Sequence, residues 1–281
     1  MPQPWQHLSF KNKHPRDEHI VFYEPTHTYY INGSSDGVIS CTKFLHEFFP
    51  HFDPDVTIEK MMKSKKWTSS VWYGKTATEI KNEWNSKGNE ASKAGTAMHL
   101  AIEQFLHGSP EEISSETYLT KEWKYFMNFW NDVSGNLVPY RSEWEVWMDE
   151  FKLAGSIDMV FYRKSDNSYV IYDWKRSKDL KTENNFANGY GPVSHLPDSN
   201  YWHYTLQLNT YKYFLEQHYG LNVSDMYLVI IHPDAKNYMQ LRLNHLDTEV
   251  VEMLQCRKRA LESGVNRAIV LPLPECNFID E

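Results

Sequence analysis

The residues best suited to chemistry are two acids and a lysine on strand-like runs in the middle of the chain. Asp158 lies in the run KLAGSIDMVFYR, and Asp173 and Lys175 end the apolar run YVIYDWK. Side chains two positions apart on a strand share one face, so we expect Asp173 and Lys175 to lie together. Charged groups at the end of an apolar strand are rare unless they are paired or bind a metal. The spacing therefore indicates either an ion pair at a strand edge or a reactive site.

Hydrolysis of a phosphodiester is the reaction that these side chains would support. Two carboxylates on adjacent strands can hold Mg²⁺ or Mn²⁺, because hard cations prefer oxygen ligands. Such ions polarise a phosphate and generate hydroxide near neutral pH. Lys175 would orient the attacking water or stabilise the negative charge that develops.

Two predicted helices carry further candidates. His99 lies in AGTAMHLAIEQFL, whose apolar positions recur at helical spacing from Ala94 onward. Gln207 and Tyr211 are four residues apart in a helix predicted over 202–219, so they share a face. Taken alone, His99 is either a core histidine or a ligand, and the Gln207 face is either half-buried or turned to a substrate.

In this order the motifs resemble the signature of the PD-(D/E)XK nucleases, in the RecB-like branch that includes Cas4-like nucleases and the mitochondrial genome-maintenance exonuclease. The matching residues are G-T-x-x-H at Gly95, Thr96 and His99, an acid at Glu143 or Glu145, G-x-x-D ending at Asp158, D-x-K at Asp173 and Lys175, and Q-x-x-x-Y at Gln207 and Tyr211. The resemblance covers about Phe22 to Pro233. The stretch HTYYING…VISCTKFLHEFFPHFD also resembles members encoded by large DNA viruses.

The resemblance implies a role for each of these residues. Catalytic roles fall to His99, Asp158, Asp173, Lys175, Gln207 and Tyr211, with the last two beside the substrate phosphate. The metal, Mg²⁺ or Mn²⁺, would be held by His99, Glu143, Asp158, Asp173 and the carbonyl of Trp174. Glu143 and Glu145 alternate to the same face, so parity leaves them open, and we favour Glu143 from its distance to G-x-x-D in relatives.

Basic residues near the catalytic strand are candidates for nucleic-acid binding. Arg176, Lys178 and Lys181 follow that strand and, with Tyr211, would contact the substrate; ordinary surface lysines are the alternative. The segment 57–88 also carries Lys60, Lys63, Lys65 and Lys66. It is either a solvated helix face or a basic arm that follows phosphates.

Composition limits the class of protein. Lys and Arg number 29 against 37 Asp and Glu, a net charge of −8, so a nucleic acid must be met by a local basic patch or through metal ions. The three cysteines cannot supply four thiolates, so we expect no iron–sulfur cluster. Without a signal peptide or an apolar span, we expect a soluble intracellular protein, in the cytoplasm or at a viral replication site.

The element order predicts an α/β (α+β) fold with a restriction-endonuclease-like core, a central mixed β-sheet flanked by helices and a helical N-terminal part. We expect a hairpin over 20–33, a helix capped by Ser40 or Thr42, helical structure over 57–88, a helix from Ala94, a helix over 120–130, an antiparallel three-strand meander over 140–175, a loop over 179–200, a strand over 226–233 and a helix over 247–263 stopped by Gly264. A single nuclease domain, 1–281, would comprise the hairpin and arm (20–93), the catalytic core (94–245) and the C-terminal helix and tail (246–281).

The sequence thus predicts a metal-dependent DNA nuclease, with an exonuclease as the favoured mode. Its partner would be single-stranded DNA or double-stranded DNA with ends, with a helicase or recombination protein and a homo-oligomer as further partners. The alternative is a catalytically inactive nuclease fold that binds DNA or a protein. The polarity of digestion and the strand preference stay open.

Overall fold

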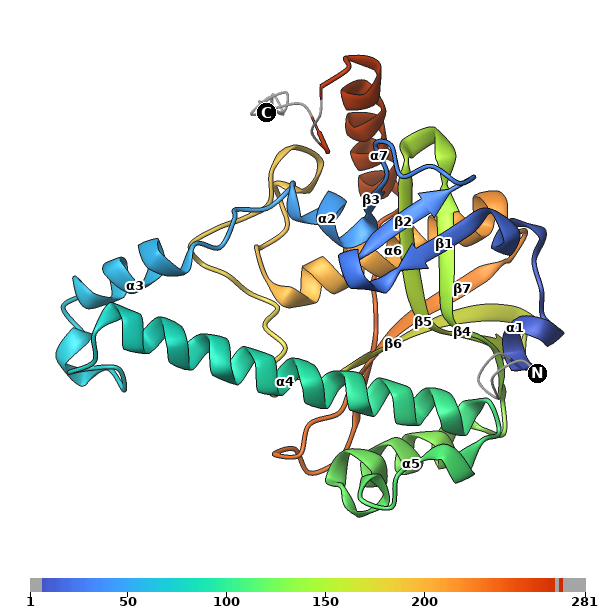
Figure 1. Cartoon of the computed structure of the whole chain (residues 1–281), viewed down its shortest axis with the longest axis horizontal. Helices are drawn as coiled ribbons and strands as arrows, with labels where there is room; N and C mark the ends of the chain where they lie inside the picture. Colours follow the sequence, from blue (N-terminus) through green and yellow to red (C-terminus); the bar gives the residue numbers. More distant parts are fainter. Residues whose placement is uncertain (1–6, 266–267, 270–281) are drawn as a thin grey trace, which may run out of the picture.

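A six-stranded mixed sheet with helices on both faces forms the centre of the molecule (Figure 1). The computed structural model describes residues 7–265 and 268–269; Cys276 and most of the predicted C-terminal tail lie outside them. The helices are α1 (His7–Lys11), α2 (Cys41–His46), α3 (Pro54–Met62), α4 (Ala77–Leu106), α5 (Lys121–Val133), α6 (Asn200–His218) and α7 (Asp247–Glu262). The strands are β1 (Ile20–Tyr23), β2 (Thr28–Ile31), β3 (Ile39–Ser40), β4 (Leu137–Met148), β5 (Leu153–Arg163), β6 (Ser168–Lys175), β7 (Val223–Ile230) and β8 (Met239–Arg242). The predicted fold class is confirmed.

The predicted meander is confirmed as β4, β5 and β6, paired antiparallel in sequence order. Short connections at 149–152 and 164–167 allow only this arrangement of neighbouring strands. Strand β7 then runs parallel to β6, and helix α6 supplies the crossover that a parallel pair requires. The short strands β3 and β8, which the pattern did not predict, extend the sheet beside β5 and β7.

Two apolar layers cover the sheet. One packs α2, α6 and α7 against side chains such as Ile171 and Leu228, and the other packs α4 and α5 against Tyr172 and Trp174. Alternation along β6 therefore turns successive side chains to opposite layers, as expected for a strand buried on both faces. The predicted hairpin at 20–33 is confirmed as β1 and β2, and Ser40 caps α2 through the backbone nitrogen of Lys43.

Helix α4 starts 17 residues earlier than the helix that the sequence predicted from Ala94. A capping box of Thr76 and Glu79 fixes its first turn, and the helix continues through Gly88 and Gly95. At 1.5 Å per residue its 30 residues span about 45 Å. The boundary between the predicted arm and core, at 93/94, consequently falls inside one helix.

The first half of α4 and helix α3 form an arm that extends away from the sheet (Figure 1). The segment 57–88 is not one helix: α3 ends at Met62, a short turn covers Trp67–Ser69, and α4 begins at Ala77. Asp53 caps α3, and Pro54 occupies its first position. Among the described residues, no helix is long and apolar enough to cross a membrane.

Candidate active site

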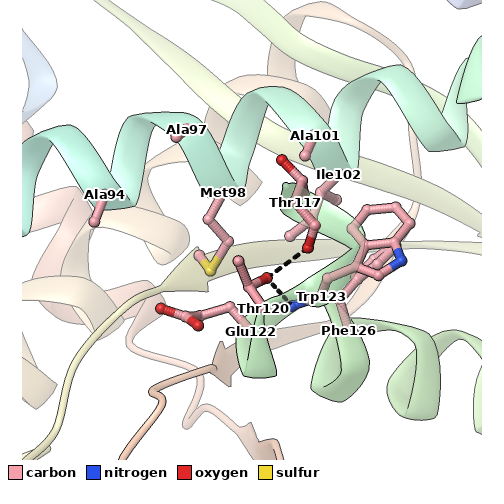
Figure 2. Close-up of a pocket in the computed structure, with 10 residues that line it drawn as sticks. All are labelled: Ala94, Ala97, Met98, Ala101, Ile102, Thr117, Thr120, Glu122, Trp123 and Phe126. Atoms are coloured by element: carbon pink, nitrogen blue, oxygen red, sulfur yellow. Dashed lines mark hydrogen bonds between the residues drawn. The ribbon is translucent and has the colours of Figure 1, made fainter. Parts of the chain in front are cut away.

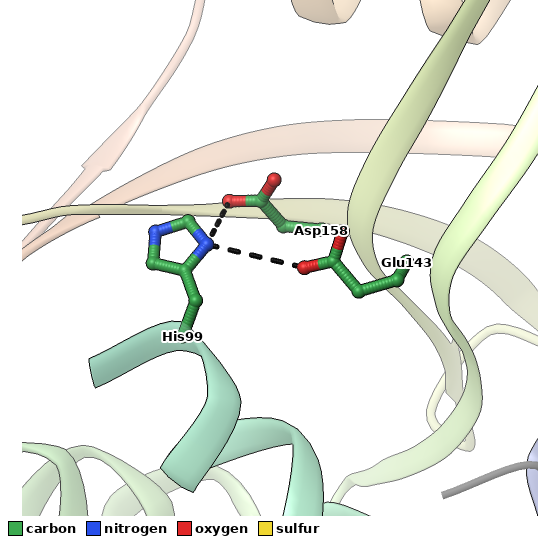
Figure 3. A group of neighbouring side chains, drawn as sticks. All are labelled: His99, Glu143 and Asp158. Atoms are coloured by element: carbon green, nitrogen blue, oxygen red, sulfur yellow. Dashed lines mark ion pairs between the residues drawn. The ribbon is translucent and has the colours of Figure 1, made fainter. Parts of the chain in front are cut away.

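His99, Glu143 and Asp158 meet at one point although they come from three different elements, α4, β4 and β5 (Figure 3). Nδ1 of His99 lies 3.6 Å from Oδ2 of Asp158 and 3.9 Å from Oε1 of Glu143. Glu143 faces Asp158 across the two strands, between the pairs Ser142–Met159 and Trp144–Ile157. The side chains therefore form a compact group with two acids around one imidazole.

Glu143 has a backbone conformation unusual for a strand residue. Its φ is +40°, in the left-handed region that side chains other than glycine seldom adopt. Such conformations persist only where the surroundings enforce them, and they are concentrated at functional sites. Here Ser156, the residue after Gly155, donates a hydrogen bond to Oε2 of Glu143 at 3.2 Å.

Glu145 lies elsewhere. It is paired with Ser156 across β4 and β5, and its surroundings include the backbone of Phe22 in the N-terminal hairpin. Burial raises the pKa of the Glu145 carboxyl group, and the backbone hydrogen bond at Phe22 opposes that rise. Of the two acids that the sequence left open, the structure brings Glu143 to His99.

The backbone of Trp174 joins the group to strand β6. Its N–H donates to Oδ2 of Asp158 at 2.9 Å, and its carbonyl accepts a hydrogen bond from Nε2 of His99 at 2.8 Å. Because that bond uses Nε2, the other ring nitrogen of His99 is the one turned to the two carboxylates. Trp174 thus orients both His99 and Asp158; metal binding by its carbonyl stays a prediction.

Asp173 and Lys175 lie on the same face of β6, as the spacing predicted, with Oδ2 and Nζ 2.5 Å apart. The Asp173 side chain is only 5% exposed. The lysine also lies over the ring of Tyr204 from α6, 4.8 Å from its centre. Despite this close ion pair, Oδ2 of Asp173 has no partner with hydrogen-bond geometry among the described residues.

The pKa values reflect this crowding of charge. Burial and the neighbouring Asp158 raise the pKa of Asp173 to about 6, although Lys175 opposes the rise. Burial would lower the pKa of His99, but Asp158 and Glu143 outweigh it and raise that pKa to about 9. Without a bound cation, His99 is therefore protonated at neutral pH and balances part of the acidic charge.

An open pocket of about 540 Å³ gives access to the group. His99, Glu143, Lys175 and Arg176 line it, together with Glu103, which sequence reasoning missed. Burial, and then the charge of Glu143, raise the pKa of Glu103 to about 7. Glu103 follows His99 by four residues in α4, so helical spacing was the signal that could have identified it.

Gln207 and Tyr211 lie behind the group, on α6. Gln207 donates to the hydroxyl of Tyr211 at 3.2 Å, and the Tyr211 ring is 3% exposed within the core. An added Cβ at Gly155 would lie 2.6 Å from that hydroxyl oxygen, so only glycine fits there. Gly155, the first residue of the G-x-x-D motif, thus leaves space for Tyr211, the last residue of the Q-x-x-x-Y motif. The contacts of Gln207 and Tyr211 with substrate stay predictions.

The three basic residues after β6 lie in different settings. Nε of Arg176, on the pocket wall, donates to Oε1 of Glu122 at 2.9 Å. Lys178 is exposed and ion-paired with Asp234, and the Lys181 side chain is exposed without an ion pair to any described residue. Their role in nucleic-acid binding stays a prediction.

A second, apolar pocket of about 160 Å³ lies on the other side of α4 (Figure 2). Met98 and Ile102 of α4 and Trp123 and Phe126 of α5 line it. Thr120 fixes the start of α5 by accepting from the backbone of Trp123 at 3.1 Å. Packing on this side holds α4 so that His99 faces the acids.

The side chains at the acidic group suit a divalent cation. One ligand atom each from His99, Glu143 and Asp158 lies within 4.8 Å of the others. Ligands of a single ion with metal–oxygen distances of about 2.1 Å lie about 3 to 4 Å apart, so small side-chain shifts suffice. Asp173 supplies a further carboxylate, with its Oδ2 ion-paired to Lys175. This mainly carboxylate set is of the kind that Mg²⁺ and Mn²⁺ prefer.

The chain is similar to one family model and, distantly, to solved structures. The family model described as "PD-(D/E)XK nuclease superfamily" matches residues 72–276, most of the chain. Among solved structures, a "Putative exonuclease" from Eubacterium rectale is 11% identical, with a TM-score of 0.38; the match covers 60% of this chain and 65% of that one, so it spans less than two thirds of that protein. SSO0001 is 12% identical, with a TM-score of 0.33, over 90% of this chain and 82% of that one. No curated protein matches the chain. From the extent of the family match, the chain belongs to the PD-(D/E)XK nuclease superfamily.

Proposed function

We propose that the protein is a metal-dependent DNA nuclease that uses Mg²⁺ or Mn²⁺, with digestion from DNA ends as the favoured mode. The observation that carries the proposal is the grouping of His99, Glu143 and Asp158 beside the Asp173–Lys175 pair, with His99, Glu143 and Lys175 lining one open pocket. Nucleases of this superfamily act on nucleic acids and generally use divalent metal ions. A protein that only binds DNA has no need for this set of acids and lysine.

His99, Glu143, Asp158 and Asp173 would hold the cation, with the carbonyl of Trp174 as a further ligand. A cation bound there would polarise the scissile phosphate and lower the pKa of the attacking water. Lys175 has its ammonium group beside Asp173, where it can orient that water and stabilise negative charge on the phosphate. Neighbouring acids raise the pKa of Lys175, after allowance for burial, and keep it charged.

The surrounding residues hold these groups in place. Trp174 fixes the His99 ring through its carbonyl and Asp158 through its N–H. In this proposal Gln207 and Tyr211 support the phosphate side of the pocket, and Arg176 lies on its wall. Such prior positioning matters because hydrogen bonds and charges fixed in advance need not reorganise during the reaction.

Incubation with end-labelled single- and double-stranded DNA tests the proposal. We expect cleavage with Mg²⁺ or Mn²⁺, none with EDTA, and none by Lys175→Ala. The ladder of products would show whether digestion starts at an end, and from which one. Cleavage that continues in EDTA, or at the wild-type rate in Lys175→Ala, would contradict the proposal.

A further inference from the structure

The arm is strongly basic in a chain that is acidic overall. From the start of α3, residues 54–93 contain eight lysines against four glutamates and one aspartate, with no arginine or histidine, whereas the whole chain has a net charge of −8. A protein with this balance needs a local basic surface to attract a polyanion. The arm is therefore the part of the molecule whose charge complements a nucleic acid.

Half of these lysines are not neutralised by neighbouring acids. Lys63 pairs with Glu59, Lys81 with Asp55, and Lys75 and Lys87 share Glu83. The remaining four are exposed and form no ion pair with any residue that the structure describes: Lys60, Lys65, Lys66 and Lys93. Such side chains are free to contact phosphates, and they can do so without breaking an existing pair.

Aromatic rings lie between these lysines. Tyr73 is 58% exposed and contacts Trp67, with the ring centres 5.9 Å apart. Trp72 packs edge-on against Trp84, and the ammonium groups of Lys75 and Lys87 lie over its ring. Tyr73 therefore offers an exposed ring against Trp67, which directly follows Lys65 and Lys66; rings and lysines together are typical of surfaces that bind nucleic acids without sequence preference.

Helix α4 connects this surface directly to the active site. Ala91, Gly95 and His99 recur at four-residue spacing and line the catalytic pocket, whereas Lys93, two positions from Ala91 and Gly95, lies on the opposite face of the helix. Ala77, at the start of the helix, precedes His99 by 22 residues, which is about 33 Å at 1.5 Å per residue. At 3.4 Å per base pair, that distance matches about ten base pairs of a duplex.

We propose that the arm is a binding surface for the DNA substrate. Lys60, Lys65 and Lys66 contact phosphates about one duplex turn away from the pocket. This inference rests on the proposed nuclease function and adds the path of the substrate to it. The contacts are independent of base sequence, because phosphates carry no sequence information.

Binding of fluorescent duplexes of 6 and 24 base pairs in EDTA, at a series of KCl concentrations, tests the arm. The variant is Lys60→Gln/Lys65→Gln/Lys66→Gln. The matched control is Lys11→Gln/Lys124→Gln/Lys258→Gln, three exposed lysines outside the arm that change the net charge equally. For the 24-mer we expect the arm variant to lower the slope of log K against log salt by about 0.9 for each lost contact, nearly 3 in all. For the 6-mer, which is too short to reach the arm and the pocket at once, we expect a smaller change.

Cleavage by the same proteins separates this inference from the nuclease assignment. The arm variant should cut the 6-mer at close to the wild-type rate and, at concentrations below saturation, cut the 24-mer more slowly than the control does. Equal salt slopes for the arm variant and the control on the 24-mer would overturn the role of the arm. A wild-type protein that cuts neither duplex would overturn the nuclease assignment, while an arm-dependent salt slope in that protein would still support the binding surface.

Discussion

The two acidic parts of the candidate active site balance their charges in different ways. In the group of His99, Glu143 and Asp158, the side chains are 27%, 43% and 16% exposed, and the interatomic distances are 3.6 to 3.9 Å. In the Asp173–Lys175 pair, the aspartate is 5% exposed and the charges are 2.5 Å apart. The first part is open and loosely paired, whereas the second is buried and contains its own cation.

This difference indicates a division of labour. A buried pair is fixed when the protein folds, since separating its charges in a medium of low dielectric constant is costly. An open group of two carboxylates and an imidazole can exchange its proton for a cation as conditions change. Lys175 would therefore be a permanent part of the site, and the occupant beside His99 a variable one.

Removing Lys175 breaks the buried pair, and we expect this change to have the largest effect on cleavage. For Lys175→Ala we expect cleavage to fall by at least about a hundredfold, the usual loss when one charge-stabilising group is removed. The variant should also lose up to about 3–5 kcal/mol of stability, because Asp173 is left buried without its partner. Single-turnover cleavage and urea unfolding measure the two effects. The double variant Asp173→Asn/Lys175→Met should regain stability without regaining cleavage. Regained cleavage would contradict the role of Lys175 as a permanent part of the site.

A side chain at Gly155 should disturb the packing of Tyr211, which lies behind both acidic parts of the site. Gly155→Ala places a Cβ 2.6 Å from the hydroxyl of Tyr211, so we expect a loss of about 1–3 kcal/mol from overpacking. The control is Gly88→Ala in α4, where nothing lies within 4 Å and the change should stabilise by about 1 kcal/mol. Denaturant unfolding compares them, and equal stability of both variants would show that the Tyr211 contact is unimportant.

Replacing each of the two neighbouring acids on β4 in turn should show which of them belongs to the open group. We expect Glu143→Gln to weaken Mn²⁺ binding by about 10- to 100-fold, comparable with losses at supporting residues of metal sites. Glu145→Gln, directed to the hairpin, should leave binding unchanged. Calorimetric titration of Mn²⁺ measures both, and a larger loss in Glu145→Gln would reverse the assignment.

Protonation of His99 should make metal binding depend on pH. The pKa of about 9 means that a cation taking Nδ1 at neutral pH must displace a proton. Affinity should therefore rise up to about tenfold per pH unit between pH 7 and 9, and become level above the pKa. Titration of Mn²⁺ in buffers of different ionisation enthalpy should detect the release of nearly one proton. His99→Ala should bind Mn²⁺ more weakly, with an affinity that depends little on pH between 7 and 9. A wild-type affinity that does not change with pH would exclude displacement of a proton from His99.

Local rules predicted much of this arrangement, but only where they apply. The two-residue period of a strand was enough to place Asp173 beside Lys175, and short turns were enough for the meander. The same period could not separate Glu143 from Glu145, because residues two apart share a face; in the structure an interruption of the regular backbone at Glu143, where φ is +40°, accompanies their different surroundings. That interruption depends on packing between strands, which one sequence does not reveal.

The errors in the helices have a similar origin. The capping box at Thr76 and Glu79 marks the true start of α4, whereas the prediction relied on the apolar spacing that begins at Ala94. Strands β3 and β8 are short and depend on partners far along the chain. The fit of Tyr211 against Gly155 is likewise a contact between distant residues, so it became visible only in the structure.

Mn²⁺ binding and DNA cleavage measured on the same samples of wild type and Lys175→Ala test the central claim most directly. The account predicts that the wild type binds Mn²⁺ and cuts end-labelled DNA in proportion to its occupancy. Lys175→Ala should still bind Mn²⁺ at the open group but produce no cleavage. Cleavage by wild-type protein without bound metal, or equal cleavage by Lys175→Ala at equal occupancy, would contradict it.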